Sequence, residues 1–142
     1  MSAEENKALV RRFYEQFDEG NLDVAVKILD TNCVFHFPGG VNVIGPEGYK
    51  KYVATFRTAF TDLKHIIKDM IAEGNKMVAR FEFPGTHNVE FMGIAPTGKQ
   101  IMFPGIGIYH IDNGKFVEAW IEYDALGLLQ QLGAVPPLGE DS

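Results

Sequence analysis

The sequence predicts an α+β fold in which helices pack on one face of a strongly curved antiparallel sheet. Three observations lead to this prediction. Apolar residues recur mainly at helical spacing through the first 60 residues, strand-like runs follow from about residue 63 to residue 124, and short turn sequences separate those runs. Helices followed by consecutive antiparallel strands are typical of an α+β domain. We expect one domain, residues 1–142 with a core at about 5–133, because no internal repeat or linker interrupts the chain.

The first half of the chain supplies three predicted helices. Ser2-Ala-Glu-Glu5 has the form of a capping box, so the first helix should begin there and end at Gly20. A short second helix should follow. Residues 33–37 are aromatic and β-branched and are followed by a Pro-Gly-Gly turn, which predicts a strand. A third helix is expected over about 46–60, where aromatic and apolar residues follow a 3.6-residue period after a proline.

The second half consists mainly of predicted strands. The turn Asp112-Asn113-Gly114 contains Asn-Gly, the strongest short signal for a β-hairpin. A closing helix is expected over 125–132, with Gly133 at its end. The four strand-like runs are residues 63–72, 76–87, 99–111 and 115–124.

Charge and cysteine content exclude several classes of function. Thirteen Lys and Arg against nineteen Asp and Glu give a net charge of −6, so we expect neither a nucleic acid nor a membrane surface as partner. Cys33 is the single cysteine, which rules out an intrachain disulfide and suits a cytoplasmic location. The N-terminus lacks the pattern of a signal peptide, and no apolar run approaches the roughly 18 residues of a membrane span.

Short motifs for cofactors and metals are missing from the sequence. There is no phosphate-binding Gly-rich loop with Lys-Ser/Thr, no Gly-x-Gly-x-x-Gly opening a helix, no His-Glu-x-x-His and no Gly-x-Ser-x-Gly. The four histidines lie far apart and show no metal-ligand spacing. We therefore expect no metal and no cofactor.

The last predicted strand carries a candidate acid/base. Period-two alternation places Asp124 on the same face as Trp120 and Glu122, with Phe116 and Glu118. If that face lines a cavity, Asp124 is placed to act as a general acid or base. The alternative is a solvated face on which Asp124 caps the helix that begins at Ala125. The catalytic assignment therefore requires that Asp124 face the cavity.

The histidines and aromatic residues supply further candidates. His36, His87 and His110 are candidate hydrogen-bond donors, although a lone histidine in a strand is more often structural; His65 is the one most expected to be structural. The abundant aromatic residues suit either a packed core or the wall of a pocket for a flat apolar ligand. The candidate ligand-binding residues are Trp120, Glu122, Phe13, Tyr14, Tyr52 and Phe56.

Several segments together resemble a known family. They include Leu9-Val-Arg-Arg-Phe-Tyr-Glu15, Gly85-Thr-His87, Glu90-Phe-Met-Gly-Ile-Ala-Pro-Thr-Gly98, Gly114-Lys-Phe-Val-Glu-Ala-Trp120 and Asp124-Ala-Leu-Gly-Leu-Leu-Gln-Gln-Leu-Gly133. In this order they resemble the SnoaL-like polyketide cyclases of the nuclear-transport-factor-2-like superfamily, over about residues 5–133. The resemblance implies a cystatin-like cone, a bent antiparallel sheet wrapped round helices, with a deep apolar pocket.

The resemblance also implies an activity and a partner. In the characterised cyclases a pocket Asp acts as acid/base in an intramolecular aldol condensation without metal or cofactor, and by its position that residue resembles Asp124. The expected ligand is a small apolar, aromatic or polyketide-like carbonyl compound. The alternative is a noncatalytic module that binds small molecules in the same pocket. A homodimer through the outer sheet face is expected, with Ile121 and Tyr123 in the interface.

Overall fold

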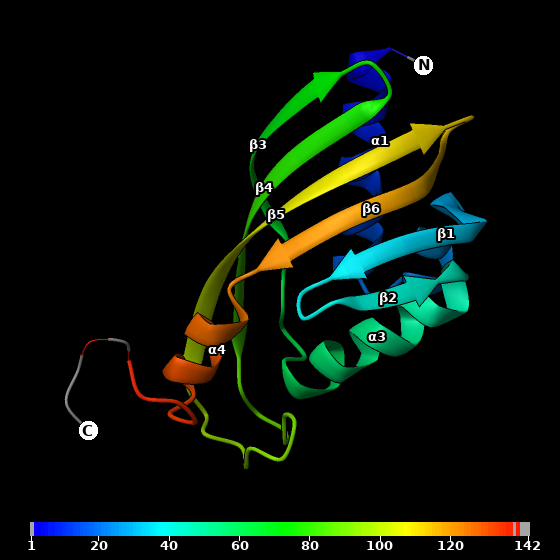
Figure 1. Ribbon diagram of the computed structural model, residues 1–142. Coiled ribbons are helices and arrows are strands. Elements are labelled where there is room, and N and C mark those ends of the chain that lie inside the picture. Colours follow the sequence, from blue (N-terminus) through cyan, green and yellow to red (C-terminus); the bar gives the residue numbers. More distant parts are fainter. Residues whose placement is uncertain (1, 138, 140–142) are drawn as a thin grey trace.

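The computed structural model describes residues 2–137 and 139; residue 1 and residues 138 and 140–142, at the ends of the expected domain, lie outside the described residues. The described residues form four α-helices, one 3-10 helix and one six-stranded sheet (Figure 1). Among them, no helix has both the length and the apolar character of a membrane span. The elements are α1 (Ala3–Asp18), α2 (Leu22–Ala25), η1 (Val26–Ile28), β1 (Leu29–Phe37), β2 (Val41–Ile44), α3 (Gly45–Ala59), β3 (Ile66–Glu73), β4 (Lys76–Thr86), β5 (Gln100–Asp112), β6 (Lys115–Tyr123) and α4 (Ala125–Gln131).

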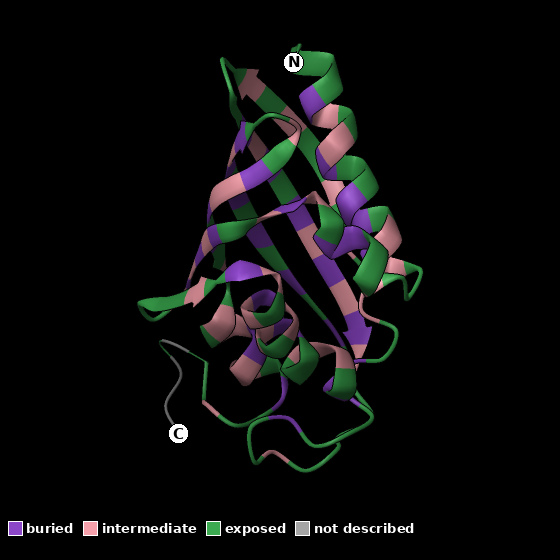
Figure 2. Cartoon of the chain, turned by 90° about the vertical axis from the view of Figure 1, so that its right-hand side faces the viewer, coloured by how far each residue is buried: buried purple, intermediate pink, exposed green. Residues whose placement is uncertain are grey.

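Helix α1 begins where the capping box predicts. The Ser2 hydroxyl accepts a hydrogen bond from the Glu5 backbone N–H, and the Glu5 carboxylate accepts one from the Ser2 N–H, both at 3.1 Å. These two bonds satisfy N–H groups that the first turn leaves unpaired. The helix then buries one stripe of side chains against the sheet, among them Val10, Phe13 and Phe17 (Figure 2).

The sheet is mixed rather than wholly antiparallel. Its strand order is β2-β1-β6-β5-β4-β3, and every neighbouring pair is antiparallel except β1 and β6, which are parallel. The expectation of a purely antiparallel sheet is therefore wrong at this pair, because β1 is separated from the β3–β6 meander by β2 and α3 and enters beside the last strand. Strand β2 was not predicted either, since its four residues are mostly exposed and show no alternation.

The concave face of the sheet carries the core, and two glycines of β5 shape it. Buried and exposed residues alternate along β4 and β5 (Figure 2). A Cβ atom at Gly105 would lie 2.5 Å from the Phe83 ring, and one at Gly107 would lie 2.7 Å from the Tyr109 hydroxyl oxygen. Both distances are shorter than real Cβ contacts, so only glycine lets these two aromatic rings lie across the strand.

A register shift in β6 changes which residues face the core. Phe116 pairs with Ile111 and Glu118 pairs with His110, so Val117 is an extra residue on β6. Before this irregularity Phe116 faces inward, and after it the odd-numbered residues do. Uninterrupted alternation was therefore the wrong premise. Ile121 and Tyr123 were expected in a dimer interface, but they line the inside of the sheet.

Candidate active site

An inner chamber of about 60 Å³ lies between the helices and the concave face of the sheet. Its wall is almost entirely aromatic, and all five tyrosines of the chain contribute to it. His65 also lines it, whereas no Asp, Glu, Lys or Arg is among the described residues of the wall. The five tyrosines are Tyr14, Tyr49, Tyr52, Tyr109 and Tyr123.

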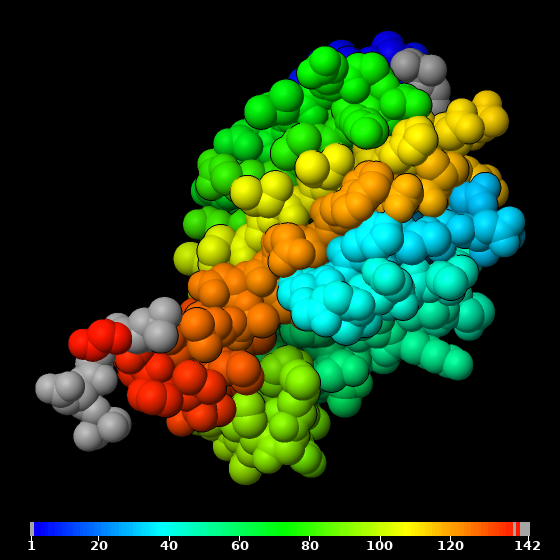
Figure 3. Space-filling model, in the orientation of Figure 1, coloured from blue at the N-terminus to red at the C-terminus, as the bar shows by residue number. Residues whose placement is uncertain are grey.

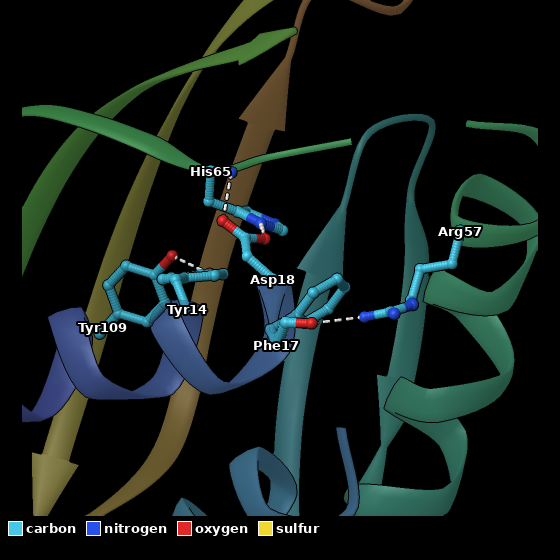
Figure 4. Close-up of polar contacts among 6 residues, drawn as sticks. All are labelled: Tyr14, Phe17, Asp18, Arg57, His65 and Tyr109. Carbon is cyan, nitrogen blue, oxygen red and sulfur yellow. Dashed lines mark hydrogen bonds and ion pairs between the residues drawn. The ribbon is translucent and has the colours of Figure 1, made fainter. Parts of the chain in front are cut away.

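Asp18 and His65 form a hydrogen-bonded pair beside this chamber (Figure 4). Asp18 is the last residue of α1, and His65 directly precedes β3. One carboxylate oxygen lies 2.7 Å from His65 Nδ1, and the other accepts the His65 backbone N–H, also at 2.7 Å. The side chains are only 16% and 11% exposed. Because the carboxylate accepts a hydrogen from Nδ1, the neutral ring carries its proton there, and Nε2 keeps its lone pair.

Aromatic rings enclose the His65 imidazole. The Tyr14 ring stacks on it with ring centroids 4.4 Å apart and planes 28° apart, and Phe17 and Phe83 meet it edge-on at 4.6 and 5.4 Å. The ring is therefore fixed in orientation as well as in tautomer. A fixed imidazole with a free lone pair, in an apolar chamber, is suited to general acid/base chemistry.

Arg57 holds the end of α1 that carries Asp18. From α3, its guanidinium donates a hydrogen bond to the Phe17 carbonyl oxygen and lies 5.0 Å from the centre of the Phe17 ring (Figure 4). A cation at a helix C-terminus interacts favourably with the helix dipole and with an unpaired carbonyl. Arg57 thereby stabilises the last turn of α1, from which Asp18 reaches His65.

The tyrosine hydroxyl groups are the polar groups that the chamber offers besides His65. Tyr14 and Tyr109 share one hydrogen bond, and the hydroxyl oxygens of Tyr52 and Tyr123 lie 2.6 Å apart. Tyr49 is buried and makes no side-chain hydrogen bond to any described residue. Burial is the main cause that raises the pKa of every one of these hydroxyl groups. All five therefore stay protonated at neutral pH and are able to donate hydrogen bonds.

A second, outer cavity of about 510 Å³ adjoins the chamber. It lies between α3, α4, the turn after β1 and the loop that carries Phe91 and Met92. Tyr52, Phe56 and Tyr123 line both spaces, so these three side chains form the boundary between them.

The candidate ligand-binding residues separate into three groups. Tyr14, Tyr52 and Phe56 line the chamber. Phe13 instead packs in the core, with ring centroids 5.1 Å from Phe116 and 5.6 Å from Tyr49. Trp120 and Glu122 are exposed on the convex face of the sheet, which the space-filling view in Figure 3 presents to the reader. The pocket role expected for these last two is wrong, because of the register shift in β6.

Asp124 lies outside both cavities. It is exposed, and one of its carboxylate oxygens accepts the Gly127 backbone N–H at 2.8 Å, so that it caps α4. The alternative reading as a helix cap is thus the one that the geometry supports. The catalytic expectation for Asp124 fails, since its carboxylate does not face either space.

The three histidines expected to assist Asp124 do not line the chamber either. His36 sits on the convex face between Asn42 and Glu118, with ring nitrogens 2.8 and 2.6 Å from their oxygens. His110 is also on that face, opposite Glu118 in the sheet register.

His87 is fully buried, and its Nδ1 accepts a hydrogen bond from the Thr97 backbone N–H. This bond ties together the two ends of the loop that carries Phe91 and Met92. A structural role, the alternative given for each of these histidines, matches the contacts that they make. His65, the histidine most expected to be structural, is the one in the chamber wall.

Comparison with known proteins gives one family and many related folds. The family model described as SnoaL-like polyketide cyclase matches residues 8–132. AclR from Streptomyces galilaeus, a candidate hydroxylase, is 27% identical with a TM-score of 0.88, and the match covers 98% of this chain and 91% of that one. IdmH from Streptomyces antibioticus, a candidate polyketide cyclase, is 26% identical with a TM-score of 0.82 and coverage of 90% and 98%. A candidate polyketide cyclase from Bacillus cereus is 32% identical, with a TM-score of 0.78 and coverage of 95% and 87%. No curated protein matches the sequence.

Proposed function

The chain belongs to the SnoaL-like polyketide cyclase family, and we propose that it is an enzyme in which His65 is the acid/base that acts on a small apolar carbonyl compound. The observation that carries this proposal is the Asp18–His65 pair, which places an imidazole of fixed tautomer in the wall of the chamber. The role first expected for Asp124 is assigned to His65, because His65 reaches the chamber and Asp124 does not.

The proposed reaction begins with proton transfer from carbon. The Nε2 lone pair of His65 takes a proton from the carbon next to the carbonyl group, and the electron pair of the broken C–H bond forms the enolate. The imidazolium that results is stabilised by the Asp18 carboxylate at Nδ1. The same Nε2 then returns its proton, either to a second carbon in an isomerisation or to the new alkoxide after an intramolecular aldol addition.

Tyrosine hydroxyl groups are the candidates to stabilise the enolate oxygen. Preorganised donors that point to a developing negative charge contribute strongly in a site that excludes water. Tyr49 is the best candidate, since it lines the chamber and is free of hydrogen bonds to the described residues, so that it loses no internal bond when it binds the ligand. With a proton acceptor and donors supplied by its own side chains, the proposed reaction needs no cofactor.

We also propose a homodimer through the convex face of the sheet. One row of paired residues crosses five strands on this face, and apolar side chains occupy four neighbouring positions in it, three of them exposed. An apolar centre with a polar rim is typical of protein interfaces. The row consists of Ile71, Val78, Ile108, Trp120 and His36.

The proposed activity is testable without the natural substrate. We would follow deuterium uptake from D₂O next to the carbonyl group of 2-tetralone, a small bicyclic ketone, by proton NMR. Loss of a general base lowers rates by about 10²–10⁴-fold, so His65→Gln should lower the exchange rate by that factor or to the rate in buffer. His110→Gln removes a histidine from the convex face and should leave the rate unchanged.

Two results would contradict the proposal. One is an exchange rate in His65→Gln equal to that of the unmodified protein. The other is binding of 2-tetralone by the unmodified protein, seen as a rise in Tm, with no exchange above buffer. The second result would favour the alternative, a noncatalytic small-molecule-binding module.

A further inference from the structure

Two tyrosines lie at the boundary between the outer cavity and the chamber that His65 lines. Tyr52 comes from α3 and Tyr123 from the last position of β6, and both line both spaces. The hydrogen bond between their hydroxyl groups, 2.6 Å long, therefore joins the helix layer to the sheet at the boundary. A ligand that crosses the boundary between these two side chains has to break that bond.

The volumes of the two spaces show why the passage matters. An engineered apolar cavity of about 150 Å³ is known to bind benzene, whereas the inner chamber has about 60 Å³. The chamber, as its side chains lie in this structure, is therefore too small for a six-membered ring. The outer cavity, at about 510 Å³, lies within the range of roughly 300–1,000 Å³ that is common for ligand pockets. A ring compound therefore fits the outer cavity, and it fits beside His65 only after side chains of the chamber wall have moved.

The two tyrosines are held to different degrees. The Tyr52 ring stacks face to face on the buried Phe37 ring, with centroids 3.8 Å apart and planes 15° apart. Tyr123 contacts Phe56 and Phe103 with its ring plane inclined by 84° and 61°. No parallel ring covers Tyr123 among the described residues, and it is the last residue of its strand. Tyr52 is thus the fixed half of the pair, and Tyr123 is the half that moves.

We infer that Tyr52 and Tyr123 form a specificity gate, which admits apolar ring compounds that carry a hydroxyl or carbonyl oxygen on the edge that enters first. Opening breaks the hydrogen bond between the two hydroxyl groups in a place that is partly shielded from water, and an unpaired polar group there is unfavourable. An oxygen on the ligand replaces the lost bond, whereas a pure hydrocarbon does not. The inference rests on the proposed function only in taking His65 as the ligand's destination.

The experiment compares phenol with benzene, which differ by one oxygen. Entry into the chamber is read from the imidazole resonances of His65 in ¹⁵N-labelled protein, so that a probe bound only in the outer cavity is not counted. The unmodified protein should bind phenol more tightly than benzene. Tyr52→Phe and Tyr123→Phe keep the rings but remove the hydrogen bond, which has a net effect of about 2- to 12-fold on an equilibrium. Benzene should bind more tightly by about that factor in each variant, because the open state is more populated, and the preference for phenol should shrink.

Thr86→Val is the matched control. It removes a hydroxyl group and its hydrogen bond to the Asp62 carboxylate, and neither residue lines either cavity. Its preference for phenol over benzene should equal that of the unmodified protein. Because neither probe reacts, the titration gives its answer whether or not the protein catalyses deuterium exchange.

Three outcomes would overturn the gate. The preference for phenol stays unchanged in both Tyr52→Phe and Tyr123→Phe; it shrinks equally in Thr86→Val; or neither probe shifts the His65 resonances of the unmodified protein. The first shows that the boundary hydrogen bond does not control entry, and the second shows that the change in preference does not come from the boundary. The third shows that the passage does not open for a ring.

Discussion

Replacing Asp18 by Asn tests the Asp18–His65 pair with the smallest change in shape. One carboxylate oxygen accepts a hydrogen bond from the His65 backbone N–H. A backbone N–H can only donate, so its partner has to be an acceptor. The amide must therefore turn its oxygen to the backbone and its NH₂ group to Nδ1. An NH₂ group facing Nδ1 requires that Nδ1 accept, so the ring proton moves to Nε2 and the lone pair that the proposed reaction uses is lost.

The expected loss of activity is large. A base in the wrong tautomer contributes as little as an absent one, so deuterium exchange into 2-tetralone should fall by about 10²–10⁴-fold. In Ser-His-Asp triads the same replacement leaves the geometry intact and lowers turnover about 10⁴-fold for this reason. The assay is the NMR measurement of exchange, run beside thermal unfolding of each variant.

Asp62→Asn is the matched control for the loss of a carboxylate. Asp62 also accepts a backbone N–H and a side-chain hydrogen, both from Thr86 and both at 2.7 Å, but it does not line either cavity. The Asp62→Asn variant should unfold at a lower Tm than the unmodified protein, with little change in the rate of deuterium exchange. The reasoning is refuted if Asp18→Asn keeps more than half of the exchange rate, or if Asp62→Asn loses as much.

Three further predictions concern the cap, the convex face and pH. Asp124→Asn should leave both the exchange rate and Tm nearly unchanged, since Asn caps a helix about as well as Asp; a large loss of exchange would return the acid/base role to Asp124. Ile108→Lys should convert the dimer to a monomer, as measured by light scattering. If the unmodified protein is already a monomer, the proposed interface is wrong. The Glu118 carboxylate, assisted by Asn42, raises the pKa of His36. Because the folded-state pKa is the higher one, this stabilisation is full below about pH 6.5 and is lost as the pH rises through the folded value. Glu118→Gln should therefore be less stable than the unmodified protein at low pH, by up to about 1 kcal/mol, because both partners are about one-third exposed. The difference in the free energy of unfolding, measured with urea, should vanish at high pH. An equal difference at low and high pH would contradict the assignment.

Local chemistry made the element boundaries predictable, and long-range pairing limited the rest. The capping box at Ser2 and the hairpin at Asn113 act within a few residues, and both occur where the sequence predicts them. Strand β2 forms because it pairs with β1 over Val34–Phe37. The pattern of its own four residues does not predict that pairing. The parallel pairing of β1 with β6 likewise joins segments more than 80 residues apart, and no local pattern encodes it.

The facing of β6 shows how one extra residue displaces a whole set of functional assignments. With the irregularity at Val117, Trp120 and Glu122 move to the convex face, and Ile121 and Tyr123 move to the chamber. A strand read with uninterrupted alternation exchanges its two faces at such a point. The hint in the sequence was Phe116, an aromatic residue that uninterrupted alternation would have placed on one face with Glu118, Glu122 and Asp124.

The positions of two carboxylates at helix ends suggest a way to find the site in related sequences. Asp124 precedes a helix, where a negative charge is favourable and the backbone supplies a partner. Asp18 is the last residue of a helix, where the dipole disfavours a negative charge, and the last turn contains no basic residue to offset it. A carboxylate in the unfavourable position needs a partner from elsewhere in the chain, and here the partners are the backbone and side chain of His65, 47 residues away. The acid that its own helix does not stabilise is therefore the better candidate for a functional role, and the acid that serves as a cap is the weaker one.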